Sequence, residues 1–99
     1  ADNKLTQHAH QWGIAEKGAA LTTEQLGVMR NLTKHIYENA STIRQGVWGN
    51  PAAGGFNNAL FYSNGKHIVV TQSDGTMITI LRNAAGNKHF DKAATIWTR

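Results

Sequence analysis

The sequence predicts an α+β domain in which two N-terminal helices pack on one face of a four- to five-stranded antiparallel sheet. Apolar side chains recur at helical spacing in the first half, whereas the second half has short apolar runs separated by Asn-Gly and Asp-Gly. The length of 99 residues suits one small core. We therefore expect a single domain over residues 1–99, with a helical part at 1–40, a loop at 41–58 and the sheet at 59–99.

The first expected helix begins at Asp2, whose carboxylate can accept a hydrogen bond from the backbone N–H groups of the first turn. Leu5, Ala9 and Trp12 fall on one face at i, i+4 and i+7. Gly13 is expected to end this helix, because glycine readily adopts the left-handed conformation that follows a last turn.

The second expected helix begins after Thr22, which has capping-box spacing to Gln25. Apolar residues then recur on one side of the helix and are expected to form its buried stripe: Leu26, Met29, Leu32, Ile36 and Ala40.

Residues 41–58 read STIRQGVWGNPAAGGFNN, with several glycines and the only proline of the chain. This composition is typical of a long irregular connection. A short strand at Ile43 to Trp48 remains an alternative within it. Long loops in compact domains often carry function, so this segment is a candidate for one.

Two consecutive hairpins are expected around Asn64-Gly65 and Asp74-Gly75, dipeptides that favour two-residue turns. Such turns would pair Ser63 with Lys66 and Ser73 with Thr76. A last strand, ATIWT at 94–98, follows the loop at 83–93.

The same register predicts which side chains share each face of the sheet. Tyr62, His67 and Arg82 would form one cross-strand row, which is either a phosphate-binding group or an ordinary polar cluster. Phe61, Ile68 and Leu81 would form the row on the other face, and Thr79 would lie opposite Val70 on that face.

The composition narrows the classes of function. Ten Lys and Arg against six Asp and Glu give a net charge of +4 and a pI near 9.8, which favours either a polyanionic partner or a simply basic domain. The absence of cysteine excludes disulfides, a thiolate nucleophile and a cysteine zinc site. No apolar run approaches the ~18 residues of a membrane span, so we expect no membrane anchor. The chain also lacks a signal-peptide pattern, and we interpret it as a fragment of a larger protein.

The histidines at 8 and 10 are candidates for acid–base chemistry. His8 lies one turn from Lys4 and from Trp12, on the apolar side of the first expected helix, and His10 points roughly the other way. This geometry does not let both bind one metal ion, so we expect no metal site. An imidazole there suits a general acid or base, or it packs against Trp12 as a structural residue.

Other chemistries lack support in the sequence. His35 and His89 fall outside the apolar faces and are expected in solvent. The six acidic residues are scattered, which argues against a glycosidase, two-metal chemistry and a metal-dependent deoxyribonuclease.

Three short motifs occur in order along most of the chain: HAHQWG at 8–13, GVWG at 46–49, and IVVTQSDGTMIT at 68–79, followed by ATIW. In this order they resemble the toxin ribonucleases of the barnase–EndoU–colicin–RelE superfamily. The similarity is greatest to the C-terminal toxin domains of contact-dependent growth inhibition proteins and to the anticodon-cleaving colicins.

The resemblance implies an endoribonuclease that uses no metal or cofactor. The ribose 2′-OH attacks the adjacent phosphate and leaves a 2′,3′-cyclic phosphate, within a tRNA anticodon loop. His8 would be the acid–base residue, Thr79 would donate to a non-bridging oxygen, and Arg44 and Lys4 would supply positive charge.

Alternatives to these roles stay open. His10 is an alternative to His8, and the row of Tyr62, His67 and Arg82 is an alternative site. Thr79 also suits a strand simply as a β-branched residue.

RNA contacts are expected from Trp48, or alternatively Trp97, by stacking and from Arg30 and Lys66 by charge. The alternative for Trp48 is a place in the core.

The resemblance further implies a tRNA substrate and an acidic cognate immunity protein, and it leaves open whether a host factor must activate the domain. The domain would be the C-terminal fragment of a secreted or cell-surface bacterial effector that acts in the cytoplasm of the target cell. A non-catalytic RNA- or protein-binding module is the alternative of a different class.

Overall fold

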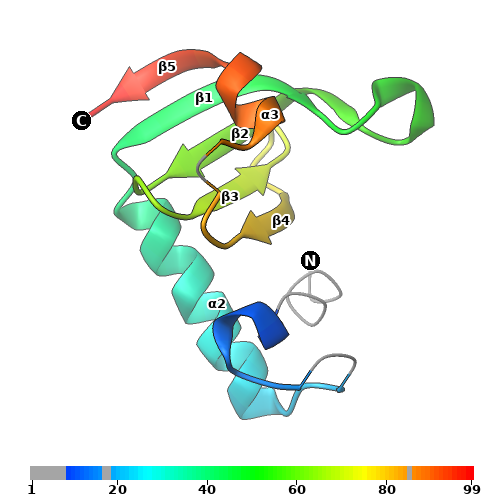
Figure 1. The fold of residues 1–99 in the computed structure, drawn as a ribbon, viewed down its shortest axis with the longest axis vertical. Coiled ribbons are helices and arrows are strands. Elements are labelled where there is room, and N and C mark those ends of the chain that lie inside the picture. The colour runs from blue at the N-terminus through cyan, green and yellow to red at the C-terminus, as the bar shows by residue number, and fades with distance from the viewer. Residues whose placement is uncertain (1–8, 17–18, 85) are drawn as a thin grey trace.

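The computed structural model describes residues 9–16, 19–84 and 86–99. It is an α+β structure with one main helix and a five-stranded antiparallel sheet of order β4-β3-β2-β1-β5 (Figure 1). Its elements are η1 (Ala9–Trp12), α2 (Thr23–Glu38), β1 (Thr42–Trp48), η2 (Pro51–Ala53), β2 (Phe56–Ser63), β3 (Ile68–Thr71), β4 (Met77–Leu81), α3 (Lys88–Lys92) and β5 (Ala94–Thr98).

Helix α2 begins as the sequence predicts. The Gln25 N–H donates to Thr22 Oγ1 at 3.1 Å, and the Thr22 N–H donates to Gln25 Oε1 at 2.9 Å. These two bonds satisfy donors that the first turn of a helix otherwise leaves unpaired. Met29 and Ile36 from the predicted stripe are buried on α2.

The prediction of two N-terminal helices is wrong. In the described part of the N-terminal segment, the chain forms only the short 3₁₀ helix η1 and then turns at Gly13, which has a φ of +72°. The Ile14 N–H donates back to the Ala9 carbonyl at 3.2 Å and closes this turn. A helix this short is not stable by itself, and Ala9 is held instead by packing against α2 and the sheet. Residues 2–8 of the expected helix lie outside the described residues.

The expected loop at 41–58 is mostly ordered structure. It contains all of β1, which lies between β2 and β5 in the sheet, and the start of β2. Gly46 is required by close packing rather than by a loop, because a Cβ there would lie 2.9 Å from Ala93 Cβ. The turn between β1 and β2 contains η2, where the Asn50 side chain accepts from the Ala52 N–H at 3.0 Å. The alternative of a short strand at Ile43 to Trp48 is thus confirmed as β1, whereas the expectation of a long irregular connection, which rested on the glycine content, is wrong.

The first hairpin has a longer turn than its Asn-Gly pair predicts. Ser63 pairs with Ile68 and Tyr62 with Val69, so four residues form the turn. The cause is Asn64, whose Oδ1 accepts from the N–H groups of Lys66 at 3.0 Å and His67 at 2.8 Å. A shift of two residues keeps every side chain on its predicted face.

The second hairpin keeps its predicted register over most of its length. Ile68 pairs with Leu81 and Val70 with Thr79, as expected. Nearer the turn the pairing shifts, so that Thr71 pairs with Met77. This irregularity leaves one extra residue on β4 and bends its end.

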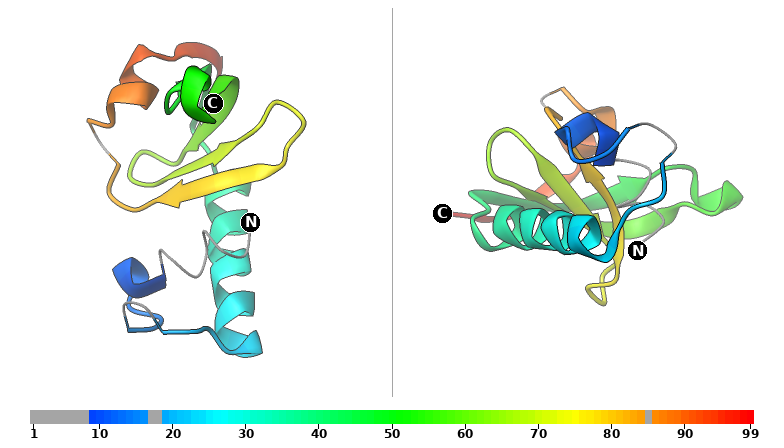
Figure 2. Two further views of the ribbon diagram at one scale, coloured as in Figure 1. Left: turned by 90° about the vertical axis from the view of Figure 1, so that its right-hand side faces the viewer. Right: turned by 90° about the horizontal axis from the view of Figure 1, so that it is seen from below.

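The sheet is covered on both faces, not on one. On one face, Met29 and Ile36 of α2 pack with Val69 and Ile80. The expected loop before β5 contains α3, which packs on the other face and lies on the opposite side of the sheet from α2 (Figure 2).

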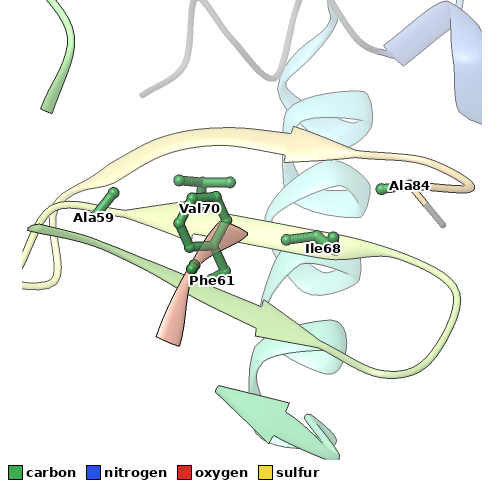
Figure 3. Packing of buried hydrophobic residues seen from close by; sticks show 6 residues of the cluster. Ala59, Phe61, Ile68, Val70 and Ala84 are labelled. Atoms are coloured by element: carbon green, nitrogen blue, oxygen red, sulfur yellow. The ribbon is translucent and has the colours of Figure 1, made fainter. Parts of the chain in front are cut away.

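The second face has its own hydrophobic cluster, which contains residues of β2, β3 and the β4–α3 loop (Figure 3): Ala59, Phe61, Ile68, Val70, Ala84 and Ala93. Phe90 of α3 packs against this cluster. The strand predicted at 94–98 is confirmed as β5, which forms the edge next to β1. No helix among the described residues is long and apolar enough to cross a membrane.

Candidate functional site

A pocket of about 250 Å³ lies where β1 begins, β2 ends and α3 crosses the sheet. Its wall combines charged side chains with hydroxyl groups, and the residues that carry them are Arg44, Lys66, Asp91, Ser41, Thr42 and Ser63. Two cations and one carboxylate leave the wall with one excess positive charge. The pocket therefore favours an anion that also accepts hydrogen bonds.

Arg44 of β1 is the most constrained of the charged groups. Its Cζ lies 4.1 Å from the centre of the Phe90 ring, and its Nη1 donates to the Phe90 carbonyl at 2.9 Å. Its Nε is buried and has no hydrogen-bond partner among the described residues. Stacking on an aromatic ring fixes the guanidinium plane, while the unpaired Nε–H is costly to leave without an acceptor. The guanidinium is thus held in a fixed orientation, and its Nε–H makes no hydrogen bond to another described residue.

Helix α3 reaches Arg44 because of two local features. The Asn87 side chain caps the helix by accepting from the Phe90 N–H at 3.1 Å. The missing side chain at Gly46 lets Ala93 approach β1. Together these place Phe90 directly over Arg44.

Lys66 belongs to the four-residue turn between β2 and β3. Its backbone is fixed on both sides, since its N–H donates to Asn64 Oδ1 and its carbonyl accepts from the Ala84 N–H at 2.9 Å. Its side chain is exposed and lines the pocket. The fold therefore brings to one pocket two residues that were predicted separately from the sequence, Arg44 and Lys66.

Asp91 was missed by the sequence analysis. It lies in the first turn of α3 and is exposed at the pocket. The only signal in the sequence was its position directly after an aromatic residue in a segment that was expected to be a loop. Without α3, nothing connected it to Arg44.

His67 lies beside the pocket but has a structural contact of its own. Its Nδ1 accepts from the Asn83 N–H at 3.0 Å, and Trp12 meets its ring edge-on at 4.5 Å between centroids. Burial lowers the pKa of His67 below its ordinary value, and the charges of Lys66 and Arg82 lower it further. The imidazole is therefore neutral near pH 7, with its proton on Nε2. In this state it can donate a hydrogen bond but cannot accept a proton at Nε2.

The row of Tyr62, His67 and Arg82 does not form as expected. Tyr62 lies opposite Val69, and its ring is 4.4 Å from that of Tyr37 on α2. Burial raises the pKa of Tyr62, as do the charge and hydrogen bond of Tyr37, while a hydrogen bond with Thr71 opposes them. Only His67 and Arg82 remain neighbours.

Three other candidates lie in varied environments. Thr79 is buried, with 2% of its surface exposed, opposite Val70 as predicted. Such a position fits the alternative that it is a strand residue. Arg30 is exposed on α2, and His10 is half-buried in η1. His8 and Lys4 lie outside the described residues.

Trp48 occupies the second face of the sheet, where it meets Phe61 edge-on at 6.2 Å between ring centres. His89 packs on it at 5.1 Å and is half-buried, so the expectation that His89 lies in solvent is wrong. The rings of Trp48, Phe61 and Phe90 form a continuous aromatic layer that ends at Arg44.

Among the described residues, no three His, Asp or Glu side chains come together as a metal-binding group. Comparison of the chain with protein-family models, curated sequences and solved structures finds no match to any of them. The resemblance to toxin ribonucleases therefore rests on the sequence motifs alone.

Proposed function

We propose that this protein is a metal-independent endoribonuclease that holds an RNA phosphate in the pocket of Arg44 and Lys66. The observation that carries the proposal is the guanidinium of Arg44, which lines the pocket and is oriented by Phe90. Lys66 adds a second cation to the same pocket. Arginine and lysine donors to phosphate oxygens form short, charge-assisted hydrogen bonds.

The reaction transfers the phosphoryl group within the RNA strand from a 5′-oxygen to the neighbouring 2′-oxygen. The 2′-oxygen forms a bond to phosphorus while the bond from phosphorus to the 5′-oxygen breaks. The 2′-OH proton passes to a general base, and a general acid protonates the leaving 5′-oxygen. Arg44 and Lys66 stabilise the charge that grows on the phosphorane oxygens.

Two groups are proposed for the acid–base role. The family resemblance points to His8, although Ala9, which follows it, packs on the α2 face of the sheet and not on the face that carries Phe90. Asp91 is the carboxylate of the pocket wall, and a carboxylate can accept the 2′-OH proton as a general base.

The resemblance also supports the biological setting that we propose. The substrate is a tRNA anticodon loop, and the domain is the toxin part of a secreted or surface effector that acts in the cytoplasm of the target cell. An acidic immunity protein suits the basic rim that Lys66 and Arg82 form around the turn of β2 and β3. The need for a host activating factor stays open in this proposal, and the assay with cell extract tests it.

A non-catalytic RNA-binding module is the second candidate, and one observation favours it. Among the described residues, no histidine lines the pocket, and the Nδ1 of the neighbouring His67 is already engaged by Asn83. A binding module would keep the phosphate contacts and lack the chemical step.

The test is incubation of the protein with total bacterial RNA in EDTA, with and without cell extract, followed by a denaturing gel and end-group analysis. We expect tRNA fragments with 2′,3′-cyclic phosphate ends. Lys66→Ala should lower the cleavage rate about 10-fold or more, because one cation at the phosphorane is lost. The matched control is Lys34→Ala, an exposed lysine of α2 outside the pocket.

Three outcomes decide between the candidates. Fragments that depend on Lys66 and not on Lys34 support the ribonuclease. Intact RNA that nevertheless binds with the same dependence favours the binding module. RNA that is neither bound nor cut, even with extract, contradicts both.

A further inference from the structure

A second groove, of about 190 Å³, lies at the other end of β2 from the phosphate pocket. Three of its five lining residues carry carboxamides, and none carries a charge: Phe56, Asn57, Asn58, Gln72 and Ser73. Asp74, the next residue along the chain, is exposed and negatively charged. A phosphate is therefore disfavoured here, and a neutral ligand with hydrogen-bonding groups is favoured.

Two strand irregularities meet at this groove. The pairing of β1 with β2 moves from Gly46↔Ala59 to Trp48↔Phe56, so Asn57 and Asn58 both lie opposite one residue of β1. The pairing of β3 with β4 also shifts, immediately before Gln72. Bulges redirect side chains and are over-represented beside functional sites.

The backbone around Gln72 is fixed while its side chain is available. Its N–H donates to the Thr76 carbonyl at 2.7 Å, and its own carbonyl accepts from the Gly75 N–H at 3.0 Å. No hydrogen bond joins the carboxamides of Asn57, Asn58 or Gln72 to another described residue. Each amide thus offers one acceptor and two donors to a ligand.

We propose that this groove binds an unpaired nucleobase of the RNA substrate. The inference rests on the proposed function and adds a site that determines sequence preference. A carboxamide places a donor beside an acceptor, which matches the paired donor and acceptor on the edge of a base. Unpaired RNA bases are read by such edge contacts and by contact with aromatic rings, which Phe56 supplies.

The distance between the two sites sets the role of the groove. Strand β2 has eight residues, so its ends are roughly 20 to 25 Å apart at the usual rise of a strand. The bound base is therefore several nucleotides from the phosphate in the pocket. Its recognition selects the RNA, whereas Arg44 and Lys66 act on any sequence.

The experiment measures cleavage and binding of a set of stem-loop RNAs in which each loop base is changed in turn. The wild-type protein should prefer one base at one loop position by about 10-fold, the usual worth of a good bidentate contact. The double variant Asn57→Ala/Asn58→Ala and the single variant Gln72→Ala should each reduce that preference at least about 5-fold. Asn31→Ala, at an exposed amide of α2, is the matched control and should keep it.

A further comparison separates this inference from the proposed function. Lys66→Ala should weaken the binding of all RNAs by a similar factor and leave the preference for the base intact. Retained preference in the groove variants, or no base preference in the wild type, overturns the nucleobase site while RNA cleavage stands. A wild-type protein that neither binds nor cuts any RNA of the set overturns the proposed function as well. Thermal melts of each variant show whether its fold is intact.

Discussion

At the scale of single residues, the central feature is that Arg44 is held by aromatic stacking as well as by a hydrogen bond. Its guanidinium stacks on Phe90 and donates to the carbonyl of the same residue. Lysine keeps the charge but has neither the planar stacking group nor the fork of donors. A substitution at position 44 can therefore show whether RNA binding needs only the positive charge or also the fixed geometry of the donors.

We predict that Arg44→Lys weakens RNA binding about 10-fold, although the net charge is unchanged, because the fixed donors are lost. Fluorescence anisotropy with a labelled RNA measures this, and urea unfolding measures any loss of stability. Lys66→Arg is the control at an exposed position and should bind normally. Equal affinity of Arg44→Lys and wild type would show that charge alone matters.

The second prediction at this scale concerns His67. Its pKa in the folded state is lowered by burial and by the neighbouring Lys66 and Arg82, so the unfolded chain binds a proton more readily. The protein should therefore lose stability as the pH falls below the ordinary histidine pKa of about 6.5, and gain nothing further above it. Protonation also removes the acceptor of the Asn83 N–H.

Thermal melts at about pH 7.5 and pH 5.5 check this. His67→Asn offers an uncharged acceptor near the position of Nδ1, so its melting temperature should fall less between the two pH values than that of the wild type. The other histidines are present in both proteins and serve as the internal control. An identical fall in both proteins would contradict the assignment of this pH dependence to His67.

At the scale of elements, the pocket depends on how closely α3 approaches β1. Gly46 makes that approach possible, since a Cβ there would lie 2.9 Å from Ala93 Cβ and 3.0 Å from Ala93 Cα. A side chain at this position must push α3 away from the sheet. Phe90 would then move away from Arg44.

We predict that Gly46→Ala lowers the free energy of unfolding by about 1–3 kcal/mol, the usual cost of overpacking. RNA affinity should fall with it. Gly27→Ala is the control, because Gly27 lies within α2 with open space around it and should stabilise the protein by up to about 1 kcal/mol. Urea unfolding measures both variants. An unchanged free energy of unfolding in Gly46→Ala would mean that α3 can move away from β1 without loss of stability.

Prediction from the sequence succeeded where the signal was local. The capping box of Thr22 and Gln25 and the segment of β5 follow from adjacent residues, and the faces of β2 and β3 follow from their alternation. It failed where tertiary contacts overrode composition. Gly46 indicated a loop although it serves the packing of α3, and the side chain of Asn64 lengthened a turn that its dipeptide predicted to be tight.

The site was predictable only in part, for the same reason. Arg44 and Lys66 were proposed separately, but no local pattern shows that β1, the β2–β3 turn and α3 meet at one pocket. Asp91 and the carboxamide groove depend on α3 and on strand bulges, neither of which the periodicity reveals.

At the scale of the whole molecule, the two candidate sites lie at opposite ends of one strand, β2. The phosphate pocket is at its end, near Ser63, and the carboxamide groove is at its beginning, near Phe56. In the function that we propose, the net charge of +4 would draw RNA to the surface without sequence preference. We propose that the carboxamide groove selects the RNA and that the pocket binds its phosphate, so the two functions lie at opposite ends of β2.

The central claim is that an RNA phosphate binds at Arg44, and one measurement tests it most directly. Two-dimensional ¹H–¹⁵N NMR of the labelled protein follows the side-chain Nε–H of Arg44 during titration with a 2′-deoxy oligonucleotide, which lacks the attacking hydroxyl. We expect this signal and the backbone amide of Lys66 to shift first and to saturate together, because a phosphate in the pocket lies against both residues. Shifts confined to other regions, with the Arg44 signal unmoved at saturation, would contradict it.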